Sequence, residues 1–134
     1  MKLLFLEIET PGPWLLASMG PATIGAYLRE RGHGAALLRV APDAGPDQVA
    51  AGVGREAPDL VGVSISTRQW PRAREVIGGL RRRLDVPVLA GGLHATFAPE
   101  TVLAAEGFDW VCIGEGEGAT LDLLAALERH RESD

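Results

Sequence analysis

The chain is poor in cysteine and has no long hydrophobic run. Its single cysteine, Cys112, excludes an internal disulfide and any cluster built from several thiolates. A helix that spans a bilayer needs about 20 consecutive apolar residues, and no stretch of this chain approaches that length. Glu7 and Glu9 interrupt the apolar start of the chain before a signal-peptide pattern develops. We therefore expect a cytoplasmic protein that does not bind a membrane.

Positive charge is also scarce. Thirteen Lys and Arg residues stand against 18 Asp and Glu residues, which gives a net charge of −5, and the arginines are spread over several segments. Such a chain has no basic field to hold a nucleic-acid backbone, so we expect no nucleic-acid partner. A hydrophobic content of 46% over 134 residues is typical of one globular domain, and we expect residues 1–134 to form it.

Short apolar runs alternate with segments of helical periodicity. The runs are continuously apolar rather than alternating, which indicates strands covered on both faces, as in a parallel sheet between helices. The strands are expected at residues 3–8, 35–40, 60–65, 86–90 and 110–113, and the helices at 21–31, 46–56, 71–84, 99–105 and 119–130. The fold class predicted is α/β: a flavodoxin-like, Rossmann-like five-stranded parallel sheet of order 2-1-3-4-5, with helices on both faces.

Two glycine-rich turns, Gly91-Gly92 and Gly114-Glu115-Gly116, each follow an expected strand. Glycine tolerates positive φ and lets the backbone come close to another molecule. Because the carboxyl ends of parallel strands share one edge of a sheet, these turns predict a flat, polar ligand at that edge. Further donors expected there are the hydroxyls of Ser64, Ser66, Thr67 and Thr120.

Several segments together resemble a known family. They read MGPATIGAYL at 19–28, RGH at 31–33, PDLVGVS at 58–64, AGGLHAT at 90–96 and DWVCIGEGE at 109–117. In order and spacing they are similar to the N-terminal cobalamin-binding domain of cobalamin-dependent radical S-adenosylmethionine enzymes, and the similarity covers nearly the whole chain. The resemblance implies cobalamin as the cofactor, with no iron–sulfur cluster on this chain.

The resemblance also implies where the cofactor lies. The corrin ring would rest flat across the strand ends, and its nucleotide tail would descend into a groove between the sheet and the last helix. Matching positions place Ser64, Ser66 and Thr67 beside the tail, Gly91 and Gly92 under it, and Gly114, Glu115 and Gly116 along the same groove. A side chain at Gly92 would occupy this space, so Gly92→Val is expected to weaken binding.

Three further residues are expected near this edge, and two of them have two interpretations. His94 would hydrogen-bond the rim of the ligand or cap local backbone. Trp14 would form an apolar floor beneath the corrin or pack on the protein itself. Glu9 lies at the ligand edge after the first strand. Cys112 is expected to be a buried core thiol, and no residue is expected to ligate a metal.

The chain departs from classical cobalamin-binding modules after the first strand. Those modules carry Asp-x-His-x-x-Gly there, which supplies an imidazole to cobalt and a carboxylate to hold the imidazole. Here the residues are Glu9-Thr10-Pro11-Gly12-Pro13-Trp14, and no histidine precedes His33. Cobalamin is therefore expected to bind base-off without a histidine ligand, as is common in the radical enzymes.

A second departure concerns catalysis. The family's catalytic half carries Cys-x-x-x-Cys-x-x-Cys, whose three thiolates hold an iron–sulfur cluster. One cysteine cannot do so, and we expect a stand-alone module or a fragment that is not catalytic alone and works with a radical S-adenosylmethionine catalytic domain or protein. The alternative is a ligand-free flavodoxin-like module that docks on a catalytic partner. A dinucleotide-binding domain is disfavoured, because Gly-x-Gly-x-x-Gly is absent after the first strand.

Overall fold

The structure is a computed structural model that describes residues 1–11 and 19–133. Five parallel strands form one sheet in the order β2-β1-β3-β4-β5. The strands are β1 (Lys2–Ile8), β2 (Gly34–Val40), β3 (Leu60–Ser64), β4 (Val88–Gly91) and β5 (Trp110–Val111). The predicted fold class and strand order are confirmed.

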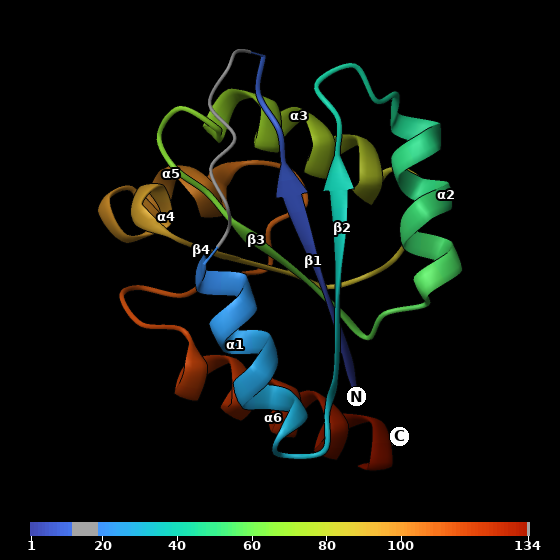
Figure 1. Cartoon of the computed structure of the whole chain (residues 1–134), viewed down its shortest axis with the longest axis vertical. Coiled ribbons are helices and arrows are strands. Elements are labelled where there is room, and N and C mark those ends of the chain that lie inside the picture. The colour runs from blue at the N-terminus through green and yellow to red at the C-terminus, as the bar shows by residue number, and fades with distance from the viewer. Residues whose placement is uncertain (12–18, 134) are drawn as a thin grey trace.

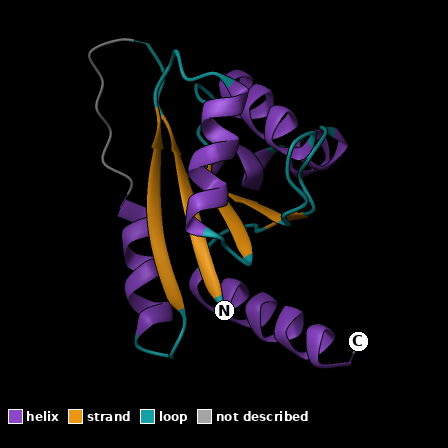
Figure 2. Ribbon diagram, turned by 90° about the vertical axis from the view of Figure 1, so that its right-hand side faces the viewer, coloured by secondary structure: helices purple, strands orange, loops and turns teal. Residues whose placement is uncertain are grey.

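Six helices connect or flank these strands within the described residues (Figure 1). They are α1 (Met19–Arg29), α2 (Pro46–Glu56), α3 (Trp70–Arg81), α4 (Leu93–Phe97), α5 (Pro99–Ala104) and α6 (Glu117–Ser133). The view in Figure 2 shows helices on both sides of the sheet. None of the helices within residues 1–11 and 19–133 is long and apolar enough to cross a membrane.

The residues of β1 alternate between two cores. Leu4, Leu6 and Ile8 belong to the larger core, which also contains side chains of α2 and α3. Leu3 and Phe5 face the other way into a smaller core, with Leu28 of α1 and Leu124 of α6 among its members. Because successive strand residues point to opposite faces, an apolar strand without alternation buries both of its faces. This accounts for the continuous hydrophobicity on which the sheet prediction rested.

The prediction missed one element. No helix was expected between the strand at 86–90 and the helix at 99–105, but Leu93–Phe97 is a short helix, α4. A helix of five residues has almost no intrinsic stability, so tertiary contacts must hold it. Ala95 of α4 is fully buried in the larger core, and the His94 N–H donates to the Ile65 carbonyl at 2.9 Å. The remaining boundaries shift by at most three residues: α3 ends at Arg81 rather than at residue 84, α6 extends to Ser133 rather than to residue 130, and β5 ends at Val111 rather than at Ile113.

Candidate cofactor groove

A groove of about 220 Å³ opens at the carboxyl edge of the sheet, on the face that α1 and α6 cover. Its walls come from the ends of the central strands and the first turns of α1 and α6. The lining residues are Phe5, Gly20, Pro21, Ile24, Gly62, Val63, Ser64, Leu89, Gly91, Gly92, Cys112, Gly114, Glu115, Gly116, Glu117 and Thr120. This is the position that the resemblance implied for a tail groove between the sheet and the last helix.

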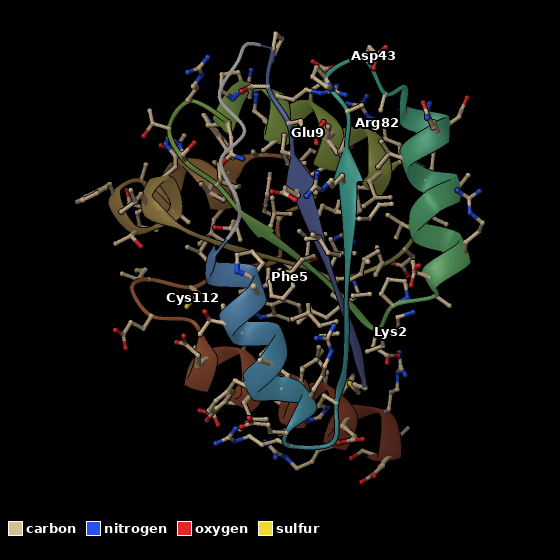
Figure 3. All side chains as sticks on the ribbon, viewed as in Figure 1. Lys2, Phe5, Glu9, Asp43, Arg82 and Cys112 are labelled. Carbon is tan, nitrogen blue, oxygen red and sulfur yellow. The ribbon has the colours of Figure 1, made fainter. Side chains whose placement is uncertain are left out.

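The floor of the groove is apolar and comes from three adjacent strands. Phe5 of β1 is paired in register with Gly62 of β3, which is in turn paired with Leu89 of β4. A Cβ at Gly62 would lie only 3.0 Å from the Phe5 ring, so glycine lets the ring lie across β3. In Figure 3, Phe5 and Cys112 lie beside α1, whereas Glu9 lies at the upper end of β1.

The glycines around the groove differ in how much free space surrounds the position that a Cβ atom would occupy. Nothing lies within 4 Å of a Cβ built on Gly20, Gly91 or Gly114. Gly91 follows Leu89 by two residues, so its side-chain position faces the groove. Gly92 is different: its φ is +90°, and a Cβ there would lie 2.7 Å from the Ile65 backbone nitrogen. The expectation that a side chain at Gly92 fills the groove is therefore wrong, because it would meet the protein's own backbone first.

Hydrogen bonds tie the loops of this edge together. The Ile65 N–H donates to the Gly91 carbonyl at 2.9 Å, which joins the loop after β3 to the end of β4. The Thr96 hydroxyl donates to the Gly92 carbonyl at 3.0 Å and accepts the Gly114 N–H at 3.1 Å. The two glycine turns are thus joined through one side chain of α4.

Cys112 is buried, as expected, but it also lines the groove. Its thiol donates to the Glu115 carbonyl at a sulfur–oxygen distance of 3.6 Å. Burial raises the pKa of the Cys112 thiol, and the nearby charge of Glu117 raises it further. The protonated form is the one that can donate, so the pKa shift and the contact with Glu115 agree.

Seven of the twelve predicted site residues come together in this groove. They are Ser64, Gly91, Gly92, Gly114, Glu115, Gly116 and Thr120. Thr120 is only 3% exposed and lies in the first turn of α6, where Glu117 stands at the amino end of the helix. Whether these residues contact a ligand stays a prediction.

Ser66 does not line the groove. Its hydroxyl accepts the Gln69 N–H at 3.3 Å, and the Gln69 side-chain oxygen accepts the Ser66 N–H at 2.9 Å. This reciprocal pair closes the turn of residues 66–69 that leads into α3. The Gln69 amide also donates to the Ile8 carbonyl at 2.8 Å, which fixes the loop after β3 to the end of β1. The Ser66 hydroxyl therefore has a structural role at this edge.

His94 and Thr67 lie together outside the groove. The Nδ1 atom of His94 is 3.4 Å from the Thr67 hydroxyl, and its ring stacks on Trp70 with centroids 5.0 Å apart. The Nε2 atom of His94 is buried and has no hydrogen-bond partner in the described structure. Trp70 also contacts Phe108, so it packs within the protein.

The other two predicted residues lie elsewhere. Glu9 donates its N–H to the Val40 carbonyl at 3.0 Å and does not line the groove. Trp14 lies outside the described residues. Among residues 1–11 and 19–133, no three His, Cys, Asp or Glu side chains come together in a way that could hold a metal ion.

The sequence interpretation missed the apolar floor and Thr96. Nothing in the sequence of an apolar strand or helix marks which of its residues the neighbouring elements leave uncovered. In the sequence, therefore, Phe5, Leu89 and Ile24 look like any other core residues. Thr96 stands four residues after Gly92, the spacing at which a helical threonine bonds back to a carbonyl. That signal is visible only once α4 is recognised as a helix.

The chain belongs to the B12 binding domain family, whose pattern matches residues 15–124. The predicted family and its cofactor, cobalamin, are thereby confirmed. Over 124 residues it is 32% identical to an anaerobic magnesium-protoporphyrin IX monomethyl ester cyclase of Synechocystis sp. strain PCC 6803, an alignment that covers 87% of this chain and 24% of the cyclase. The chain spans about a quarter of the length of the curated relatives it matches.

Solved structures share the fold. The radical S-adenosylmethionine methyltransferase TsrM from Kitasatospora setae, solved with cobalamin and a [4Fe-4S] cluster bound, superposes with a TM-score of 0.84 at 20% identity, over 96% of this chain and 25% of TsrM. A cobalamin-binding protein from Desulfitobacterium hafniense DCB-2 superposes with a TM-score of 0.63 at 20% identity, over 91% of this chain and 57% of that protein.

Proposed function

We propose that this domain holds cobalamin base-off, with the nucleotide tail in the groove and no histidine on cobalt, as the cofactor-binding part of a radical S-adenosylmethionine enzyme. The observation that carries the proposal is the glycine-walled groove at the carboxyl edge of a B12-binding fold. Ligands of open parallel sheets bind at this edge.

The groove fits part of the cofactor rather than all of it. Pockets that enclose a drug-sized ligand measure about 300–1,000 Å³, and a volume of about 220 Å³ lies below that range. A flat, mostly apolar group such as the benzimidazole of the tail matches the floor of Phe5 and Leu89. Ser64 and Thr120 would supply hydroxyls beside it, and bare backbone at Gly91 and Gly114 leaves it room.

The surroundings of the described histidines support a cobalt face without imidazole. His94 is the histidine nearest the ligand edge, but its Nδ1 faces Thr67 and its Nε2 is buried. His33 lies at the amino end of the sheet, with its Nδ1 3.3 Å from the Met1 amino group. His130 lies in the last turn of α6. The residues described after β1, Glu9 to Pro11, include no histidine either.

The proposed partner is a radical S-adenosylmethionine catalytic unit, either in the same longer polypeptide or in a separate protein. Two facts support this: TsrM is a radical S-adenosylmethionine methyltransferase, and this chain covers only about a quarter of the length of TsrM and of the cyclases. When bound, cobalamin supplies a cobalt centre able to carry a methyl group. The domain's own residues would hold and orient it, while substrate recognition would belong to the catalytic unit.

Reconstitution tests the proposal in two stages. Purified protein is mixed with hydroxocobalamin, freed of excess ligand by gel filtration, and examined by visible spectroscopy. A corrin spectrum that co-elutes with the protein is the expected result. A colourless protein would refute cobalamin binding and favour a ligand-free docking module. After reduction to cob(II)alamin, the paramagnetic resonance spectrum should lack nitrogen superhyperfine splitting, and its presence would contradict the base-off, histidine-free assignment.

A further inference from the structure

The two glycine turns are separate in sequence but are joined by the side chain of Thr96. We call the two hydrogen bonds of the Thr96 hydroxyl the clasp. The Thr96 hydroxyl donates to the Gly92 carbonyl and accepts the Gly114 N–H, at 3.0 and 3.1 Å. Gly92 and Gly114 both line the groove and both have positive φ, at +90° and +83°. One hydroxyl therefore holds together two backbone segments that lack side chains with which to hold each other.

Backbone hydrogen bonds also fix the segments from which the two turns leave the sheet. The turn at Gly91-Gly92 is joined to the loop after β3, because the Ile65 N–H bonds to the Gly91 carbonyl at 2.9 Å. The segment before the turn at Gly114 is joined to β4. Two residues before Gly114, the Cys112 N–H donates to the Ala90 carbonyl at 2.8 Å. Among the hydrogen bonds of the described residues, Thr96 is the direct side-chain link between the two turns. Thr96 therefore contributes to the spacing of the two turns, beside the backbone bond between Cys112 and Ala90.

We propose that Thr96 is a positioning residue that makes this site favour corrinoids carrying a nucleotide tail over corrinoids without one. The inference rests on the proposed function, since it assumes that the groove takes the tail. A groove whose walls are already fixed needs no ordering when the tail enters, and this preorganisation increases affinity. A tail-less corrinoid does not use the groove and gains nothing from the clasp.

The substitution Thr96→Val isolates this effect. Valine keeps the branched shape of threonine but neither donates nor accepts, so both bonds of the clasp are lost. The fold is expected to survive, because the Gly92 carbonyl also accepts the Thr96 backbone N–H at 3.1 Å and the Gly114 N–H lies at the surface. Thr96→Ser keeps the hydroxyl and serves as the rescue variant. Thr101→Val, at an exposed position of α5, is the matched control.

The experiment measures two affinities for each protein by visible-spectrum titration, one for hydroxocobalamin and one for aquacobinamide, which has no nucleotide tail. The loss of both hydrogen bonds of the Thr96 hydroxyl is expected to weaken cobalamin binding about tenfold in Thr96→Val, since only part of their strength contributes to binding. The cobinamide affinity of Thr96→Val should stay within about twofold of the wild-type value. Thr96→Ser and Thr101→Val should behave as wild type for both ligands.

Two results would overturn the inference while leaving the proposed function intact. One is unchanged cobalamin affinity in Thr96→Val. The other is an equal loss for cobalamin and cobinamide, which would show a general structural defect instead of a tail-specific one. If the wild-type protein itself bound cobalamin no better than cobinamide, the groove would not be the tail site, and the proposed function would fail along with the inference. Amide exchange at Gly114 should be faster in Thr96→Val, and unchanged exchange would contradict the clasp directly.

Discussion

Gly91 offers the sharpest test of the groove, because its side-chain position is open and its backbone is ordinary. Nothing lies within 4 Å of a Cβ built there, and its φ lies outside the left-handed range. Gly91 ends β4, where it is paired with Ser64. Gly91→Val therefore adds a branched side chain to the groove wall without straining the backbone, and valine suits a strand better than glycine does.

The magnitude follows from the size of the groove. Its volume of about 220 Å³ would be nearly filled by the flat base of a nucleotide tail, so a branched side chain would compete with the ligand for space. Inserting extra methyl groups into well-packed surroundings costs about 1–3 kcal/mol. At about 1.4 kcal/mol for each factor of ten, this predicts a loss of cobalamin affinity between about 5-fold and 150-fold.

The assay combines titration with hydroxocobalamin and urea unfolding of the ligand-free protein. Gly91→Val should bind more weakly while its free energy of unfolding stays equal to the wild-type value or rises. Gly54→Val is the matched control, because Gly54 also has nothing within 4 Å of its Cβ position but lies on α2, against the opposite face of the sheet. Unchanged affinity in Gly91→Val, with the fold intact, would refute the placement of the tail in this groove.

Two predictions concern ionisable groups. Burial alone would raise the pKa of Asp59, but the Lys2 N–H at 2.7 Å, the ion pair with Arg131 and the amino terminus together hold that pKa below its usual value. Its contribution to stability is therefore complete above about pH 4 and lost as the pH falls further. Asp59→Asn should lower the free energy of unfolding by about 1–3 kcal/mol at pH 7 and by less at pH 3 in urea titrations, and an equal loss at both pH values would contradict this. Because burial and the charge of Glu117 raise the pKa of Cys112, its reaction with a thiol reagent should need a higher pH than that of a free cysteine. Bound hydroxocobalamin should slow this reaction further, and equal rates with and without ligand would show that Cys112 does not border the occupied site.

The sheet could be predicted from the sequence because the central strands β1, β3 and β4 bury both faces and so read as apolar runs. The short helix α4 could not, since its five residues are held by tertiary contacts, notably the buried Ala95. The apolar floor was missed for a related reason. Phe5 and Leu89 look like any core residues in the sequence, and only the packing of α1 and α6 decides which part of the sheet face stays uncovered.

The glycine turns were recognised from the sequence, but the part each glycine plays depends on geometry. Gly91 and Gly92 are adjacent, yet one faces open groove and the other faces the Ile65 backbone at 2.7 Å. The same division holds in the second turn. Gly114 has open space at its Cβ position, whereas a Cβ at Gly116 would lie 2.9 Å from the end of the Ile24 side chain.

Each turn therefore combines a glycine that leaves room in the groove with one whose Cβ position lies under 3.0 Å from another part of the protein. Gly116 lets the start of α6 approach Ile24 of α1, and Gly92 adopts a conformation with φ +90° and ψ −176° that is almost confined to glycine. A side chain at Gly92 would meet the protein's own backbone before it reached a ligand, and one at Gly116 would displace the end of the Ile24 side chain, which also lines the groove. Weaker binding in such variants would say little about the cofactor. The same loss at Gly91, with unfolding unchanged, would report on the groove alone.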